Sequence, residues 1–470
     1  MQVDFTKLDR AFNPQCVVVV GDKRESDFMW LNSQSTFKGK LYSVQIAPEE
    51  IEGIKALGVE NYASLLDIPE PVDLAIVAVP RSIAPRVLED CIRKDVAAAH
   101  FFTSGFAETG TEEGTKLQRW LTERAEQANF HLIGPNCMGI FSPKVGVRHN
   151  REQYSGVSGT VGFISQSGTH ATTFVHEAHL QGLDVNKSVS FGNGVVLDSA
   201  DYLEYFGRDP EIKVIGMYLE GVKDGRRFFR VLREVSARKP VVIWKGGRTE
   251  EGGRAIASHT GSLAVPQAIW DAAVKQCGAI KVTRLEEIID TIKALVQLSP
   301  VYGNRVAVTG GAGGPSVAIA DVAAEAGLRV PLLTQESYDE LATFFTLVGG
   351  GYRNPVDTGN VNRKEMKRIL EILERDANID NLVLLVTARL GANEQLESDI
   401  ALMASIRERS SKPVMAILSH SFSPGAVEQA GNIIQKLQDG GVPTFITFER
   451  GARALRNTLD YYSLKSSADS

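Results

Sequence analysis

One local pattern occurs twice in this chain, and it restricts the possible fold more than any other feature. Residues 159–164 form an apolar, strand-forming run that leads directly into the small residues 165–168 and then into a helix-compatible stretch. Residues 305–309 lead in the same way into the glycine-rich segment 310–314, and an alanine-rich helix is predicted over residues 317–326. A strand, a turn of small residues and a helix in this order begin a βαβ unit of a parallel sheet.

The N-terminal part has the same alternation of short apolar strands and helices. Strands are predicted over residues 16–20, 39–44, 74–79 and 97–102, with a helix over residues 84–94. Runs that are apolar throughout are typical of parallel strands covered on both faces. We therefore expect an α/β protein of three consecutive doubly wound domains: a Rossmann-like domain (1–148) and two flavodoxin-like domains (149–298 and 299–470). The end of the chain, from Leu464, is predicted to be disordered.

Composition and charge exclude several classes of protein. The 470 residues carry a net charge of −6 with both signs spread along the chain, so a nucleic-acid partner is not expected. No apolar run reaches the roughly 18 to 20 residues that span a bilayer, and the N-terminus lacks a signal sequence, so we expect a cytoplasmic protein without a membrane partner. The cysteines have no CxxC spacing, which argues against disulfides and a metal site; they are Cys16, Cys91, Cys137 and Cys277.

The two turns of small residues are candidate phosphate sites. Such a turn leaves the first N–H groups of the following helix free, at the positive end of the helix dipole, where an anion is favoured. Taken singly, glycine and serine at a helix start are more often plain capping residues. Two turns in consecutive domains strengthen the phosphate interpretation, because facing domains would bring both helix starts to one phosphoryl group. The candidate phosphate-binding residues are Ser165, Gln166, Ser167, Gly168, Gly311, Gly313 and Gly314.

His259 is the candidate nucleophile. It stands among small residues after a predicted strand over residues 241–245, and we predict that it lies on a loop. A lone histidine is more often structural than reactive, but these small neighbours leave the ring room to reach a ligand. A neutral imidazole can attack a phosphoryl group through either nitrogen. The ring then needs an acceptor that orients the proton on its other nitrogen.

Five motifs follow one another along the chain: Ser165-Gln166-Ser167-Gly168, Tyr218-Leu219-Glu220-Gly221, Ser258-His259-Thr260-Gly261-Ser262-Leu263-Ala264, Gly313-Gly314-Pro315 and Asn354-Pro355-Val356-Asp357. In this order they resemble the α subunit of the NDP-forming acyl-CoA synthetases, typified by ADP-forming acetate–CoA ligase. The resemblance covers nearly the whole chain. It implies that the first domain binds coenzyme A, that His259 is transiently phosphorylated, and that Glu220 orients the His259 ring.

The resemblance also implies a reversible chain of transfers. ATP phosphorylates His259, a small carboxylic acid takes the phosphate to give an acyl phosphate, and the thiolate of coenzyme A displaces the phosphate. Acid, coenzyme A and ATP are thereby interconverted with acyl-CoA, ADP and phosphate. The chain has no Walker loop of the form GxxxxGK[ST], and the three domains leave no region for an ATP-grasp module. The resemblance therefore implies a separate ATP-grasp β subunit that binds ATP or ADP with Mg²⁺, in an α2β2 assembly.

The coenzyme A pattern of that family is altered after the first strand. Where the family reads Gly-Ala-Ser, this chain reads Gly21-Asp22-Lys23, and Val44-Gln45-Ile46 replaces Val-Asn-Pro. Lys23 and Arg24 could hold phosphates by charge, or could belong to a solvated loop of mixed charge. By resemblance, the residues that contact coenzyme A are Gly21, Lys23, Arg24, Gln45, Val79, Pro80, Ser104, Asn136 and Cys137.

Two other interpretations stay open. A noncatalytic protein that senses coenzyme A or acyl-CoA would tolerate the altered loop, but it has no need of a nucleophile together with an orienting carboxylate. The retention of His259, Glu220 and both small-residue turns favours the enzyme. The α subunit of succinate–CoA ligase is disfavoured by the third domain, which that shorter family carries on its other subunit.

Overall fold

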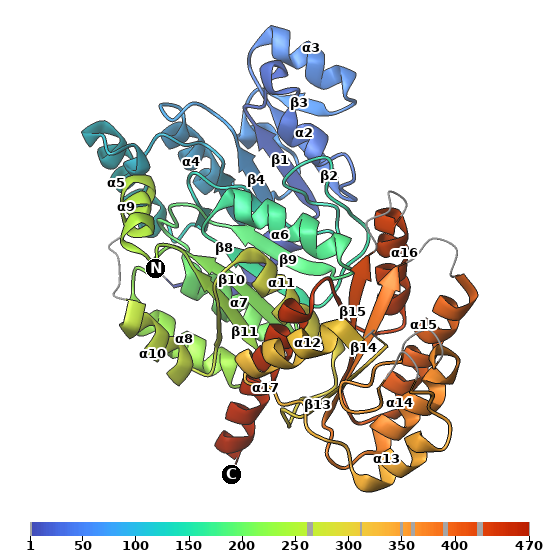
Figure 1. Ribbon diagram of the computed structural model, residues 1–470. Helices are drawn as coiled ribbons and strands as arrows, with labels where there is room; N and C mark the ends of the chain where they lie inside the picture. Colours follow the sequence, from blue (N-terminus) through green and yellow to red (C-terminus); the bar gives the residue numbers. More distant parts are fainter. Residues whose placement is uncertain are drawn as a thin grey trace. The chain divides into compact units, whose positions relative to one another are not determined.

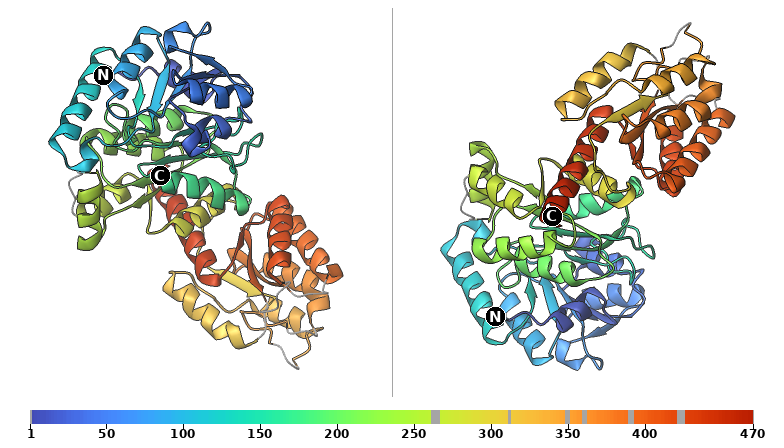
Figure 2. Two further views of the ribbon diagram at one scale, coloured as in Figure 1. Left: turned by 90° about the horizontal axis from the view of Figure 1, so that it is seen from above. Right: turned by 90° about the horizontal axis from the view of Figure 1, so that it is seen from below.

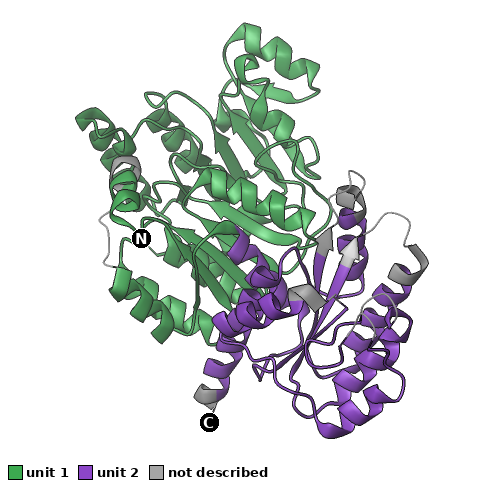
Figure 3. Ribbon diagram, in the orientation of Figure 1, with its two compact units in different colours: residues 1–285 green, residues 286–470 purple. Residues whose placement is uncertain are grey.

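The computed structural model describes residues 2–260, 267–310, 313–347, 351–358, 362–388, 393–420 and 426–469. The chain divides into two compact units, residues 1–285 and 286–470 (Figure 3). The first unit holds two six-stranded sheets and the second holds one four-stranded sheet (Figure 1). The predicted α/β class with parallel-sheet domains is confirmed. The boundaries proposed at residues 148 and 298 stay a prediction.

The first sheet has the strand order β3-β2-β1-β4-β5-β6, with every pair parallel. Its strands are β1 (Cys16–Val20), β2 (Lys40–Val44), β3 (Glu60–Tyr62), β4 (Leu74–Val77), β5 (Ala98–Phe101) and β6 (Leu132–Ile133). The helices around it are α1 (Phe5–Phe12), α2 (Met29–Ser33), α3 (Pro48–Ala56), α4 (Ala84–Arg93) and α5 (Glu112–Gln127), with short 3₁₀ helices η1 (Arg24–Ser26), η2 (Leu65–Asp67) and η3 (Ala107–Thr109). This strand order is that of dinucleotide-binding domains, and it reverses between β1 and β4.

The second sheet has the order β12-β11-β10-β8-β9-β7. Its strands are β7 (Gly139–Phe141), β8 (Val161–Ser165), β9 (Val185–Ser190), β10 (Val214–Leu219), β11 (Val241–Lys245) and β12 (Ile280–Val282). Its helices are α6 (Gly168–Leu180), α7 (Ser199–Arg208), α8 (Gly225–Ser236), α9 (Glu250–Thr260) and α10 (Gln267–Gln276). Only β7 is antiparallel, to β9. The parallel strands have the flavodoxin-like order, which reverses between β8 and β10.

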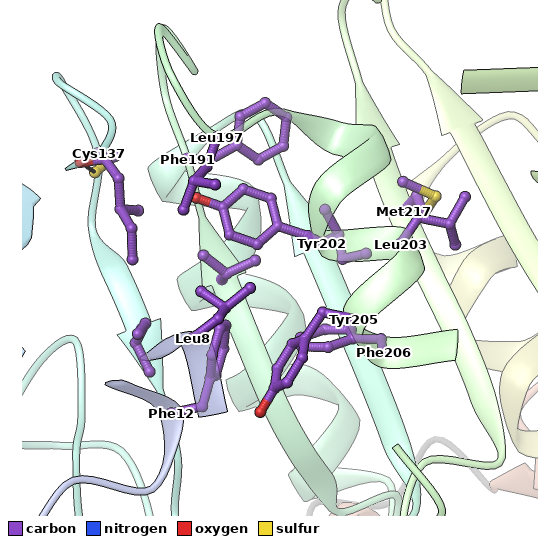
Figure 4. Packing of buried hydrophobic residues seen from close by; sticks show 14 of the residues in the cluster. Leu8, Phe12, Cys137, Phe191, Leu197, Tyr202, Leu203, Tyr205, Phe206 and Met217 are labelled. Atoms are coloured by element: carbon purple, nitrogen blue, oxygen red, sulfur yellow. Dashed lines mark hydrogen bonds between the residues drawn. The ribbon is translucent and has the colours of Figure 1, made fainter. Parts of the chain in front are cut away.

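The two sheets of the first unit share one hydrophobic core. Figure 4 shows Phe12 of α1 beside Tyr205 and Phe206 of α7, with ring centroids 5.0 and 5.5 Å apart. Cys137, which precedes β7, and Met217, which lies on β10, belong to the same buried cluster. A continuous core explains why residues 1–285 form one compact unit although they contain two sheets.

The sheet of the second unit has the order β13-β14-β15-β16, all parallel. Its strands are β13 (Val306–Thr309), β14 (Asn381–Ala388), β15 (Val414–His420) and β16 (Thr444–Phe445). Its helices are α11 (Leu285–Gln297), α12 (Gly313–Glu325), α13 (Gln335–Ala342), α14 (Met366–Arg375), α15 (Asn393–Arg409), α16 (Ala426–Asp439) and α17 (Phe448–Asp469), with the 3₁₀ helix η4 (Arg363–Glu365). A parallel bridge joins Thr309 to Val356 on the side of β13 away from β14, so the strand order reverses between β13 and β14.

Helix α17, red in Figures 1 and 2, packs beside α12 within the second unit. The expectation of disorder from Leu464 onward was wrong, because α17 continues to Asp469. Residues 463–469 contain no glycine or proline, so nothing there interrupts a helix that has already begun. Within the described part of the chain, no helix has both the length and the apolar character needed to cross a membrane.

Candidate active site

The loops after β8 and β10 lie side by side at the carboxyl edge of the second sheet. The two strands pair in parallel, with Ser165 opposite Tyr218. Ligands of such sheets bind outside the carboxyl ends of the strands, where the strand order reverses. Residues 165–168 follow β8, and Glu220 follows β10. The structure therefore brings two of the predicted site segments together at the expected place.

The side chain of Gln166 joins these two loops. Its Oε1 accepts the backbone N–H of Glu220 at 2.8 Å and that of Gly221 at 3.2 Å. The backbone N–H of Gln166 donates to the carbonyl of Tyr218 at 3.0 Å. The side-chain oxygen is thus committed to the neighbouring loop, while the Nε2 group is the donor that suits a phosphate oxygen.

Helix α6 starts directly after this loop. Ser167 is its N-cap, with Oγ accepting the N–H of His170 at 3.3 Å, and Ser165 Oγ donates to the Ser167 carbonyl at 2.6 Å. A Cβ on Gly168 would lie 2.8 Å from Cγ of Met138, so a glycine fits this position best. The 13 residues of α6 direct the positive end of their summed dipole at the loop, which favours a phosphoryl oxygen there.

Glu220 lies next to a wall of aromatic rings. It is 7% exposed, and the Tyr218 hydroxyl donates to its Oε1 at 3.4 Å. Burial, together with the Glu220 charge, raises the pKa of Tyr218, so the phenol keeps its proton. The Tyr218 ring packs against His170 and Trp244, with centroids 4.3 and 4.6 Å away. Burial lowers the pKa of His170, so this imidazole is held neutral and forms part of an uncharged wall.

His259 lies near the C-terminal end of α9. Our expectation of a loop was wrong, because the backbone is helical from Glu250 to Thr260. The three residues after Arg254 are good or acceptable helix formers, and they extend the helix through the histidine. The segment before α9 leaves the sheet beside Glu220, since the Gly246 N–H donates to the Leu219 carbonyl at 2.8 Å. The His259 side chain lies outside the described residues, so its role stays a prediction.

The second glycine-rich turn lies at the carboxyl edge of the third sheet. Gly310 follows β13 with φ +92°, and a Cβ there would lie 2.5 Å from the carbonyl oxygen of Leu385, so only glycine fits. Gly313 and Gly314 open α12, while Gly311 lies outside the described residues. A cavity of about 440 Å³ is lined by Ser316, Leu347, Gly351, Tyr352, Arg353, Pro355 and Asp357.

In the first sheet, Gly21 and Val79 meet where the strand order reverses. Gly21 follows β1 with φ +86°, and a Cβ there would lie 2.4 Å from Cγ1 of Val79. The Val79 carbonyl accepts the Thr103 hydroxyl at 2.8 Å. Pro80 and Ser104, which follow β4 and β5, are exposed. Four of the predicted coenzyme A contacts are therefore at the edge where dinucleotide ligands bind in this topology.

Further bonds tie the loops after β1 and β2 together. The Gly21 N–H donates to the Val44 carbonyl at 3.1 Å. Gln45 Nε2 donates to the Asp22 carbonyl at 3.0 Å, and Gln45 Oε1 accepts the Ile46 N–H at 2.9 Å. Gln45, predicted as a coenzyme A contact, thus uses both ends of its amide to hold these loops.

The two predicted cations of the altered loop differ in their surroundings. Arg24 is turned toward α3, where its Nη2 donates to the Glu49 carbonyl at 3.0 Å and its backbone N–H donates to Glu50 Oε2 at 2.7 Å. Lys23 is exposed and precedes η1 as its N-terminal flanking residue. Of the two, only Lys23 keeps an exposed charge without a described bond to α3.

Asn136 and Cys137 follow β6. The Asn136 N–H donates to the Thr103 carbonyl at 3.0 Å, which places Asn136 beside the loop after β5. Cys137 is 3% exposed, and its Sγ lies 3.6 Å from the carbonyl oxygens of Phe101 and Ile133. Burial raises the pKa of the Cys137 thiol to about 12. The thiol therefore stays protonated, which fits a small space-filling residue and not a nucleophile.

Asn193, which sequence reasoning missed, links the loop after β9 to the first sheet. Its Nδ2 donates to Glu108 Oε2 at 2.7 Å and to Gln118 Oε1 at 2.9 Å. Burial acts to raise the pKa of Glu108, but bonds from Asn193 and from the Gly105 N–H hold it below its usual range. In the sequence, the glycine on each side of Asn193, directly after a strand, indicates a loop in which Asn193 could have been singled out.

Two family models match the chain. A CoA binding domain matches residues 15–143, and a succinyl-CoA ligase like flavodoxin domain matches residues 158–295. The first range contains the first sheet and β7. The second range contains the other five strands of the second sheet. They agree with the resemblance drawn from the motifs.

Whole-chain relatives give the same result. The α subunit of ADP-forming acetate–CoA ligase II of Pyrococcus furiosus is 35% identical over 446 residues, covering 93% of this chain and 94% of the relative. ADP-forming acetate–CoA ligase I of Archaeoglobus fulgidus is 34% identical over 97% of this chain but over only 64% of its own length. A solved structure, dinucleotide-forming acetyl-coenzyme A synthetase 1 of Ca. Korarchaeum cryptofilum with phosphate and ADP, matches with a TM-score of 0.84 and 28% identity, over 98% of this chain and 99% of that one.

Proposed function

The chain belongs to the family of ADP-forming acetate–CoA ligases, and we propose that it performs the α-subunit chemistry of such a ligase, with His259 as the phosphate carrier. The observation that carries this proposal is the link between Gln166 and Glu220, which places the predicted orienting carboxylate beside the start of α6. A dipole that attracts phosphate and a carboxylate that orients an imidazole are the two parts that a phosphohistidine relay requires.

In this proposal, phosphate moves through one site. The neutral His259 ring attacks the γ-phosphorus of ATP, and ADP leaves as the P–O bond breaks. Glu220 holds the proton on the other ring nitrogen, and the N–H groups at the start of α6 stabilise the phosphoryl oxygens. Gly313 and Gly314, at the start of α12, are proposed to bind phosphate as well, together with Gly311.

The acid and coenzyme A then complete the reaction. A carboxylate oxygen of the acid attacks phosphohistidine to form an acyl phosphate and free His259. The thiolate of coenzyme A attacks the acyl carbon, the C–O bond to phosphate breaks, and acyl-CoA and phosphate leave. We propose that the rings of His170, Tyr218 and Trp244 exclude water from the phosphoryl group and help to shape the pocket of a small acid.

We further propose that a second subunit supplies the nucleotide. The Pyrococcus relative is named as an α subunit, and the Archaeoglobus relative is a longer chain of which this chain covers 64%. A β subunit with an ATP-grasp module, in an α2β2 assembly in the cytoplasm, would supply what the longer chain carries itself. Among the residues that the structure describes, no group of three His, Cys, Asp or Glu side chains could hold a metal ion, so we assign Mg²⁺ to the nucleotide on that partner.

Thioester formation tests this proposal. The chain, purified together with its β partner, is incubated with ATP, Mg²⁺, coenzyme A and a panel of small carboxylic acids. We expect acyl-CoA, ADP and phosphate in equal amounts for at least one acid. Formation of AMP and diphosphate, or coenzyme A binding with no turnover of any acid, would contradict it; the second result would favour a coenzyme A-sensing protein.

A further inference from the structure

Asp22 is a buried carboxylate at the coenzyme A edge of the first sheet, directly after Gly21. It is 2% exposed, and both of its oxygens are engaged by the following loop. Its Oδ1 accepts the Lys23 N–H at 3.1 Å, and its Oδ2 accepts the Leu31 N–H in the first turn of α2 at 2.8 Å. These backbone donors therefore face a carboxylate that belongs to the protein itself. Burial raises the pKa of Asp22, while the N–H groups of Leu31 and Lys23 favour its ionised form.

The position of this charge is unusual for the topology. In a dinucleotide-binding sheet, the backbone donors after the first strand receive the phosphates of the ligand. Here the donors of Lys23 and Leu31 already have an anionic partner. A ligand phosphate at this loop would lose those bonds and would lie close to a like charge.

The residues around Asp22 do not offset the repulsion between its carboxylate and a ligand phosphate. Arg24 is bonded to α3 through both its guanidinium and its backbone N–H. Residues 22–27 contain three carboxylates and two cations, so the loop is not basic. The Phe28 side chain is 6% exposed, and a Cβ on Gly53 of α3 would lie 2.5 Å from its ring, so the ring fills the space between the loop and α3.

The opposite end of α2 carries the complementary charge. Arg148 is 5% exposed, and its Nε donates to the carbonyl of Ser33, the last residue of α2, at 2.9 Å. Its Nη2 donates to Ser35 Oγ at 3.0 Å. A buried carboxylate at the start of α2 and a buried guanidinium at its end both match the direction of the helix dipole. The bonds of Asp22 to the loop and to α2 therefore hold this carboxylate in place within the fold.

We propose that Asp22 sets the affinity for coenzyme A by excluding its phosphates from the loop after β1. This inference rests on the proposed function, because it takes coenzyme A to bind at the carboxyl edge of the first sheet. Coenzyme A is then held by other contacts at this edge, and its binding is weaker than a neutral residue at position 22 would allow. Asp22 is a specificity-determining residue in this account, and it contacts no reacting atom.

Substitution of Asp22 with a neutral acceptor tests the proposal by titration of coenzyme A into the protein. In Asp22→Asn, a side-chain oxygen is kept and the charge is lost, so we expect the Kd for coenzyme A to fall at least about threefold. The Kd for pantetheine, which has no phosphate, should not change. Asp27→Asn is the matched control, because Asp27 is an exposed carboxylate of the same loop, bonded to Arg151 at 2.9 Å, and should leave both values nearly unchanged.

Asp22→Ser repeats the loss of charge with a smaller acceptor, so the test does not depend on one variant being stable. Thermal unfolding of each variant shows whether the fold is kept. An unchanged or higher Kd for coenzyme A in a folded variant, or an equal change for coenzyme A and pantetheine, would overturn the proposal. Binding is measured without turnover, so a chain that shows no ligase activity but tightens coenzyme A binding would contradict the proposed function and leave this inference standing.

Discussion

The side-chain oxygen of Gln166 lies 2.8 Å from the backbone nitrogen of Glu220 and accepts its N–H. This bond spans two loops that are far apart in the sequence and that meet only because β8 and β10 are neighbours in the sheet. It connects the segment that starts α6 with the carboxylate proposed to orient His259. The geometry of the proposed phosphate relay therefore depends on one neutral side chain, whose Nε2 group is also a candidate donor to the phosphate.

Replacing Gln166 tests this dependence. In Gln166→Ala, the N–H groups of Glu220 and Gly221 lose their acceptor, so Glu220 is held less firmly. We expect the rate of thioester formation to fall by about 10- to 100-fold and the free energy of unfolding to fall by about 1–2 kcal/mol. Gln276→Ala, at an exposed glutamine of α10, is the control and should change neither. A variant with the full rate would show that the link has no role in the reaction.

Glu220→Gln separates charge from hydrogen bonding at the proposed orienting residue. The amide has nearly the size of the carboxylate but does not stabilise a positive imidazole, so we expect turnover to fall by about 10- to 100-fold. Tyr218→Phe removes only the hydroxyl that donates to Glu220 at 3.4 Å, and it should cost less than about threefold. Steady-state kinetics of both variants check this order, which equal losses in the two variants would contradict.

The contact between Gly21 and Val79 predicts a pair of coupled substitutions. Gly21→Ala places a Cβ 2.4 Å from Val79 Cγ1 and imposes a strained positive φ, so we expect a loss of about 2–4 kcal/mol in the free energy of unfolding. Adding Val79→Ala removes the atom that clashes. The loss of stability in the double variant should therefore be at least about 1 kcal/mol smaller than the sum of the losses in the two single variants. Urea unfolding measures this coupling, and simple additivity would argue against the contact.

Two buried histidines predict loss of stability in acid. His100 is fully buried on β5, and burial, followed by the nearby charge of His149, lowers its pKa to about 3. Burial lowers the pKa of His149 to about 4. Both rings stay neutral in the folded chain, whereas the unfolded chain takes up protons below its histidine pKa of about 6.5. The contribution of these neutral rings to the free energy of unfolding should therefore be fully present above pH 6.5. It should fall as the pH drops toward 4, by up to about 1.4 kcal/mol per pH unit for each histidine.

His100→Phe should remove its share of this slope. The phenyl ring can keep the packing against Trp30, whose ring centroid lies 5.0 Å from that of His100, and it carries no proton. Urea unfolding at pH 7, 6 and 5 compares the variant with the parent chain. The free energy of unfolding of the variant should fall less between pH 7 and pH 5 than that of the parent, while equal slopes would mean that another group takes up the protons.

The position of residues 165–168 at the second sheet's switch point could be predicted, because apolar strands and small-residue turns follow one another in the order of a doubly wound fold. The hydrogen bond from the Glu220 N–H to Gln166 could not be predicted, since it depends on which strands pair. The loop predicted around His259 was wrong because small neighbouring residues were taken to indicate a loop, although the alanines among them are good helix formers and lie within α9.

Asp22 shows a similar limit in the first domain. From the sequence, its neighbours Lys23 and Arg24 could either hold phosphates or belong to a solvated loop of mixed charge, and charge alone could not show which side chain turns inward. The structure buries the carboxylate and directs Arg24 to α3. Burial is decided by the packing of α2 against distant residues such as Arg148, which no local pattern encodes.

His259 is proposed to carry phosphate, and a labelling experiment tests this role most directly. The chain and its β partner are incubated with γ-³²P-ATP and Mg²⁺, and the protein is separated and then treated with ADP or with acid. We predict a label on this chain that ADP removes as ATP, that acid hydrolyses, and that is absent from His259→Ala. A label that persists in His259→Ala, or no label in an assembly that forms acyl-CoA, would contradict the account.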